Sequence, residues 1–144
     1  MKKVIQLLLI AILCSISLEA FAANWKWVTS TDTMGFYVDI ENRSRNPLIG
    51  WEKVVYEDPT VRKQFAESMK DPTGNLDWSN FYYVCYKTQY RTNQNKVYSK
   101  FLKMVFYDTN NRVITSLDAP PNEPWELVPP NSLSEKIYIA LRDY

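Results

Sequence analysis

The sequence predicts an α+β fold: a single antiparallel β-sheet of about five or six strands, packed by a C-terminal α-helix, with a short extra helix near residues 59–69. Three observations indicate this fold. Long central segments alternate in character as half-buried strands do. Short polar turns connect these segments, which favours antiparallel pairing of sequence neighbours. The last apolar segment follows a serine that can cap a helix.

The first half of the chain predicts a hairpin, a strand and the extra helix. Residues 25–29 and 35–39 flank a polar turn and form the hairpin, and residues 41–47 have the composition of a loop. Residues 49–56 return to strand character. Asp58 is placed as an N-cap with Pro59 in the first helical position. Val61, Phe65 and Met69 then recur every four residues, which gives this helix one apolar stripe.

The centre of the chain predicts a three-stranded meander from residues 81–91, 97–108 and 112–116. Side chains alternate across a strand, so the first segment divides into two rows. One row contains Tyr82, Val84, Tyr86, Thr88 and Tyr90, and the other contains Phe81, Tyr83, Cys85, Lys87 and Gln89. Both rows are partly apolar. We therefore expect one face to pack on a helix and the other to need a second cover.

The closing segment predicts an anchored terminal helix rather than a binding site. Ser132 and Glu135 fit a capping box, in which the serine accepts a backbone N–H and the glutamate reaches back to Ser132. Trp125 is expected to plug the joint between sheet and helix. The apolar side of the helix is formed by Leu133, Ile137, Ala140 and Leu141.

The N-terminus predicts a signal peptide over residues 1–22, followed by one domain over residues 23–144. Lys2 and Lys3 precede an apolar stretch, and small residues at Ala20 and Ala22 suit a cut after residue 22 or 23. The apolar stretch is short for a membrane span, which needs about 20 residues. The prediction is an exported protein, in the periplasm or at the cell surface, with no transmembrane segment after cleavage.

The charge balance argues against a nucleic-acid partner. The sequence has 17 Lys and Arg and 16 Asp and Glu, and removal of Lys2, Lys3 and Glu19 leaves 15 of each. A neutral chain without a basic block lacks the concentrated positive charge that nucleic acids attract. The same balance argues against electrostatic binding to a membrane.

Cys85 is left without an internal disulfide partner, because Cys14 leaves with the signal. Three interpretations remain open for it: a buried small hydrophobe on a strand, an intermolecular disulfide, or a reactive thiol. The first is favoured, because free cysteine is among the most buried residue types.

The composition indicates a non-enzymatic protein without a cofactor or metal. The sequence contains no histidine, which removes the usual general base, the Ser/His and Cys/His nucleophile systems and most zinc sites. Carboxylate pairs for glycoside hydrolysis stay open as a third possibility. The candidates are Asp39 with Glu41 and Glu123 with Glu126.

Ten tyrosines favour a binding surface, because tyrosine suits interfaces where one end stays wet. Tyr82, Tyr86 and Tyr90 share one face of their strand. If this row faces away from the terminal helix, it forms a platform for a protein partner or a second copy of the chain. The alternative is that the row belongs to the core.

Several motifs together resemble the surface-adhesin protein E-like domain family. The opening Trp25–Val28 and Tyr37-Val38-Asp39, the strand that carries Trp51, and the mid-chain Cys85 are similar to family features. So is the closing pattern formed by Trp125, Val128, Pro129-Pro130 and Ser132.

The resemblance implies an exported bacterial domain whose antiparallel sheet is packed by a C-terminal helix, in a family named for adhesins that bind host proteins. Two departures stand out: the second, C-terminal cysteine of many members is missing, and the helix near residues 59–69 looks like an insertion. The function expected is an adhesin-like binding domain at the envelope or cell surface. The alternative is a periplasmic structural or assembly factor that pairs with another envelope protein.

Overall fold

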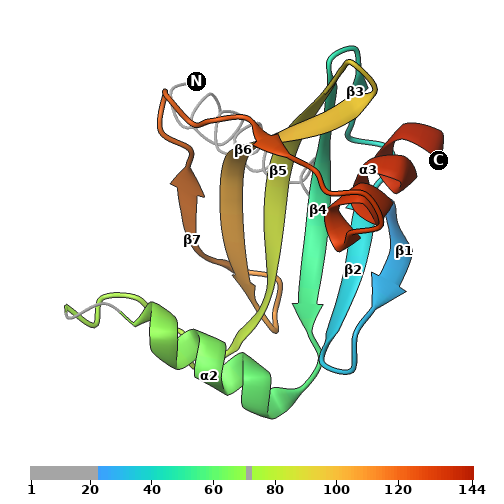
Figure 1. The fold of residues 1–144 in the computed structure, drawn as a ribbon. Helices are drawn as coiled ribbons and strands as arrows, with labels where there is room; N and C mark the ends of the chain where they lie inside the picture. The colour runs from blue at the N-terminus through green and yellow to red at the C-terminus, as the bar shows by residue number, and fades with distance from the viewer. Residues whose placement is uncertain (1–22, 71–72) are drawn as a thin grey trace, which may run out of the picture.

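A computed structural model describes residues 23–70 and 73–144, and the predicted signal segment 1–22 lies outside them. The described chain forms one antiparallel sheet with two helices (Figure 1). The strands are β1 (Trp25–Ser30), β2 (Met34–Asp39), β3 (Ser44–Arg45), β4 (Leu48–Tyr56), β5 (Phe81–Asn93), β6 (Lys96–Asp108), β7 (Val113–Asp118) and β8 (Glu126–Leu127). The helices are α2 (Pro59–Met69) and α3 (Leu133–Asp143).

The α+β class is confirmed, but the predicted number of strands is wrong, because the sheet has 8 strands. Six strands follow each other in the order β1-β2-β4-β5-β6-β7, whereas β3 pairs with β4 and β8 pairs with β6. The strands β3 and β8 contain 2 residues each. Two residues cannot show an alternating pattern, so their pairing depends on where the loop backbone runs beside a longer strand.

The predicted hairpin and meander are both present. Trp27 of β1 lies opposite Tyr37 of β2, and β5, β6 and β7 pair in sequence order. Gln94 and Asn95 connect β5 to β6 with φ angles of 50° and 62°. Two successive positive φ angles match the twist of the flanking strands, as in type I′ hairpin turns.

Both helices pack on the same face of the sheet, which we call the helix face. In one core cluster, Ile137 and Leu141 of α3 lie with Val38 of β2. In the other, Phe65 of α2 packs on buried aromatic residues of β4, β5 and β6. Val54 contacts both clusters, so the two helices share its side of the sheet. Neither α2 nor α3 covers the opposite face (Figure 1). The need for a second cover on that face therefore stays a prediction.

A bulge corrects the predicted rows of β5. The register between β5 and β6 shifts between Phe81 and Tyr83. Phe81 consequently lies in the same buried cluster as Val84, although strict alternation places these two residues on opposite faces.

The start of α3 differs in detail from the predicted capping box. Ser132 Oγ accepts the Glu135 N–H at 3.2 Å as expected. The Glu135 carboxylate instead accepts the Asn131 N–H at 2.6 Å, one residue earlier than predicted. Leu133 is exposed, and Tyr138 is buried in its place. The buried side of α3 therefore includes Tyr138, which the apolar pattern did not predict, and excludes Leu133.

Candidate functional site

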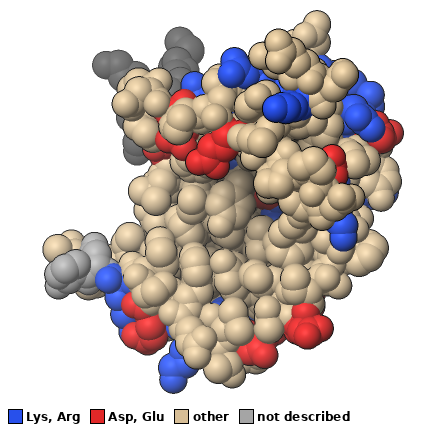
Figure 2. Space-filling model, viewed as in Figure 1, with Lys and Arg blue, Asp and Glu red and all other residues tan. Residues whose placement is uncertain are grey.

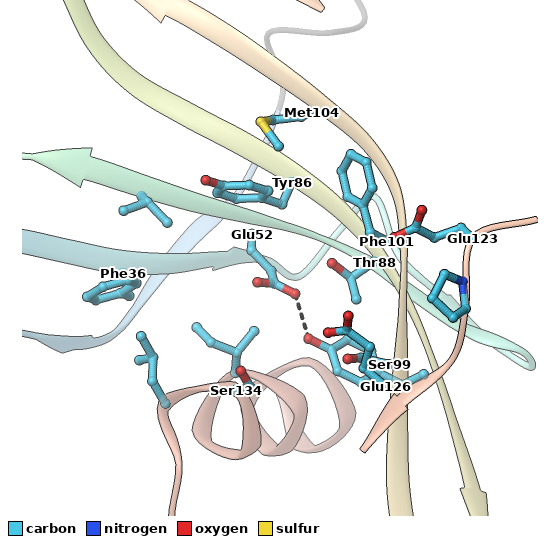
Figure 3. A pocket seen from close by; sticks show the side chains of 15 residues that line it. Phe36, Glu52, Tyr86, Thr88, Ser99, Phe101, Met104, Glu123, Glu126 and Ser134 are labelled. Atoms are coloured by element: carbon cyan, nitrogen blue, oxygen red, sulfur yellow. Dashed lines mark hydrogen bonds between the residues drawn. The ribbon is translucent and has the colours of Figure 1, made fainter. Parts of the chain in front are cut away.

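A pocket opens on the helix face between α3, the segment around β8, and strands β4, β5 and β6 (Figure 3). Its volume is about 460 Å³, which is in the range of small-molecule sites. Figure 2 shows this face hollowed in its middle, with acidic atoms gathered at the upper edge of the hollow. The pocket exists because α2 and α3 cover the two ends of the helix face and leave its centre open.

Glu52 supplies the charged group inside the pocket (Figure 3). It lies on β4 between Gly50 and Val54, on the side of the strand that faces the helices. The Tyr90 hydroxyl donates a hydrogen bond to Glu52 Oε1 at 2.5 Å. Burial raises the pKa of the Glu52 carboxyl, and hydrogen bonds from Tyr90 and Thr88 partly oppose that rise.

The walls of the pocket are mostly apolar, and its remaining charges are acidic. Glu123 and Glu126 line it from the segment that leads into β8, and none of the described lysines or arginines lines it. The apolar and aromatic wall includes Phe36, Val54, Tyr86, Phe101, Met104 and Ile137. Thr88, Ser99 and Ser134 contribute hydroxyl groups. The site therefore combines an apolar volume with carboxylates and hydrogen-bonding oxygens.

The predicted tyrosine row faces the helices, so the geometry required for an outward platform is absent. Tyr90 is 4% exposed and packs against Tyr138 of α3, with 5.4 Å between ring centroids. Tyr86 is half-buried in the pocket wall, and burial raises its pKa to about 12. Tyr82 lies under the guanidinium of Arg62 of α2, at 5.3 Å. Tyr90 thus follows the core alternative, and a binding role stays a prediction for Tyr86 and Tyr82.

The opposite side of the sheet, which we call the aromatic face, carries rings and lysines on five neighbouring strands. Cross-strand register places Tyr37, Lys53 and Cys85 in one row, and Trp51, Lys87 and Lys103 in the next. Its members are Trp25, Trp27, Tyr37, Trp51, Lys53, Tyr83, Cys85, Lys87, Lys103 and Tyr107. This surface was missed at the sequence level, because its residues come together only when the strands are ordered.

Lys53 stands at the centre of the aromatic face. Its Nζ lies 4.6 Å from the ring centroid of Trp25, 5.0 Å from that of Tyr37 and 5.6 Å from that of Tyr83. Burial lowers the pKa of this lysine. The surrounding rings hold the ammonium group by cation–π attraction, which favours its charged form. Tyr83 in turn stacks on a fourth ring, Tyr107, at 4.7 Å.

Cys85 lies beneath this aromatic cluster as a free, buried thiol. It is 4% exposed, and burial raises its pKa to about 12. This environment fits the buried-hydrophobe interpretation and opposes a reactive thiolate. A disulfide with a second chain stays a prediction that needs the surrounding rings to move.

The carboxylate pairs predicted from sequence have separate roles. Asp39 accepts hydrogen bonds from the backbone N–H groups of Asn24, Glu41 and Asn42, so it holds the end of β2. Glu123 and Glu126 both reach the pocket, where the unpredicted Glu52 joins them. The signal for Glu52 was present: it is a charged residue at a core-facing position of a strand.

Trp125 does not fill the joint between sheet and helix as predicted. The guanidinium of Arg91 lies 4.2 Å from its ring centroid, and Lys100 Nζ lies 5.9 Å away. Val128 is buried in the cluster with α3 instead. The ring of Trp125 therefore packs with basic side chains of β5 and β6.

No helix within the described residues is long and apolar enough to cross a membrane. Comparisons with protein-family models, curated proteins and solved structures find no match for this chain. The resemblance to the surface-adhesin protein E-like family therefore stays a prediction.

Proposed function

We propose that this protein is an exported, non-enzymatic, adhesin-like binding domain at the bacterial envelope or cell surface, and that it contacts a protein partner through the aromatic face. The observation that carries the proposal is this face itself, where half-exposed Trp and Tyr rings surround lysines and neither described helix lies over them. Aromatic side chains provide large contact area with little loss of conformational entropy, and they are enriched in protein interfaces.

The charges of the aromatic face indicate the chemistry of the partner. Lys53 and Lys87 both lie close to aromatic rings, and Lys103 forms an ion pair with Asp118 at 3.1 Å. Of the acidic side chains on this side, Asp39 is 2% exposed, whereas the exposed Glu57 lies at the edge of the face, beside Gly35. Lys53 and Lys87 therefore place positive charge at the centre of the aromatic face, and an acidic partner surface complements it.

Export predicts a defined N-terminus. We expect the exported protein to begin at Ala23 or Asn24, because residues 1–22 have the layout of a cleaved signal. Intact-mass measurement on protein recovered outside the cytoplasm tests this expectation, and an exported chain that retains Met1 contradicts it.

Protease treatment of intact cells then separates a surface adhesin, which is degraded, from the alternative of a periplasmic assembly factor, which is protected.

Photo-crosslinking tests the binding face. A photo-reactive benzoylphenylalanine in place of Trp27, which is 56% exposed, is expected to give a covalent adduct of one defined mass in cells that express the full chain. The same residue in place of Ile139, which is 41% exposed on α3, is expected to give none. Lys87→Glu should reduce the adduct several-fold, because it places a carboxylate against an acidic partner.

Lys136→Glu is the matched control, since Lys136 is exposed on α3 and lies on the other side of the sheet. Equal adduct yields in the two charge-reversal variants, or equal crosslinking from positions 27 and 139, would overturn the proposed face. An adduct of twice the chain's mass would replace the acidic partner with a second copy of the chain.

A further inference from the structure

The pocket on the helix face is not explained by binding through the aromatic face, which lies on the other side of the sheet. Its most informative residue is Glu52, which is half-buried, because even partial burial of a carboxylate is costly unless the group is paired or hydrogen-bonded. None of the ion pairs formed by residues 23–70 and 73–144 involves Glu52. Within the described residues, its recorded hydrogen bonds come from the hydroxyl groups of Tyr90 and Thr88.

The negative charge around Glu52 can be complemented by a positively charged ligand. The Tyr90 hydroxyl fixes one carboxylate oxygen, and the pocket volume lies in front of the carboxylate (Figure 3). Glu123 and Glu126 add negative charge to the lining, and no lysine or arginine from the described part of the chain lies there to compensate it. An anion in this pocket would face uncompensated carboxylates, whereas a cation would neutralise the half-buried carboxylate of Glu52.

The residues of the pocket wall indicate the size and polarity of the rest of the ligand. Phe101, Met104 and Ile137 provide apolar contact, so a small inorganic cation would leave most of the volume unused. Hydroxyl oxygens of Ser99 and Ser134 are available to accept hydrogen bonds from a group with several donors. A primary ammonium group has three donors, and an attached alkyl chain would bury against the wall.

We propose that this pocket binds a small alkylammonium ligand, with the ammonium group on the Glu52 carboxylate and the alkyl chain against the apolar wall. The pairing is a charge-assisted hydrogen bond within a partly desolvated site, where such bonds are stronger than in water. The proposal is independent of the function assigned to the aromatic face.

Isothermal titration calorimetry with three matched probes tests the chemistry, using protein purified after expression of the full chain. Hexylamine is expected to bind, hexanol to bind at least about tenfold more weakly, and hexanoate to give no measurable heat. These probes share an alkyl chain and differ in the charge of the head group. Equal affinity for hexylamine and hexanol, or tighter binding of hexanoate, would overturn the proposal.

Variants locate the site. Glu52→Gln keeps an oxygen that can accept the Tyr90 hydrogen bond, and it is expected to weaken hexylamine binding at least about tenfold. Glu67→Gln, at an exposed position of α2, should leave the affinity unchanged. Ser134→Trp should abolish binding by filling the pocket mouth without a change of charge, which keeps the proposal testable if Glu52→Gln fails to fold. Unchanged affinity in either pocket variant would contradict this site.

Discussion

Replacement of Phe106 by alanine is expected to lower the free energy of unfolding by about 3–5 kcal/mol. Phe106 is 0% exposed and lies in the core cluster beneath α2. Its ring meets that of Trp78 edge to face at 5.2 Å, and the ring of Phe65 lies 6.2 Å away. Alanine removes the buried ring and leaves a cavity that the surrounding strands can close only in part.

Urea denaturation followed by tryptophan fluorescence and by circular dichroism measures this loss. Tyr144→Ala is the control, because Tyr144 is 57% exposed at the end of the chain and its replacement should change stability by about 0.5 kcal/mol or less. A loss below about 1.5 kcal/mol for Phe106→Ala would show that this cluster is not a tightly packed core.

Replacement of Leu141 by alanine is expected to cost about 2–5 kcal/mol, because this side chain anchors α3 on the sheet. Leu141 is 0% exposed in the other core cluster.

A Cβ atom added at Gly50 of β4 would lie 2.5 Å from Leu141 Cδ2. The glycine thus allows the leucine to approach the strand backbone, and Gly50→Ala should itself destabilise by about 1–3 kcal/mol through overpacking.

A double-mutant cycle tests this contact. Gly50→Ala should cost less in the Leu141→Ala background, because the leucine methyl groups that it strikes are gone. Ile139→Ala on the same helix is the control, since Ile139 is largely exposed. Additive losses from the two core changes would contradict direct packing of Leu141 on Gly50.

Secondary structure was predictable because its signals are local. The N-cap of α2 is present, since Asp58 accepts the N–H groups of Thr60 at 2.7 Å and Val61 at 3.1 Å. Ser132 caps α3 in the same way. A cap, a turn and an alternating strand each depend on a few consecutive residues, so one sequence is sufficient to find them.

The candidate pocket was only partly predictable. Glu123, Glu126 and Tyr86 were singled out from the sequence, but nothing local showed that they line one cavity. Glu52 was passed over, although its position between Gly50 and Val54 on β4 places a carboxylate on the core-facing side. The strand pattern identifies such a residue. Whether its carboxylate only destabilises the core or can bind a ligand depends on the cavity beside it, which only the tertiary structure shows.

By itself, the sequence determined the α+β class, the N-terminal hairpin, the central meander and both helices. Only the tertiary structure decided which face the helices cover, and therefore that Tyr90 is core while Lys53 stands among rings on the other side. Alternation states which side chains of a strand share a face, but all the strands and the helices together decide what each face meets. The placement of α2 and α3 on one side is such a collective outcome, and it leaves both the pocket and the aromatic face open.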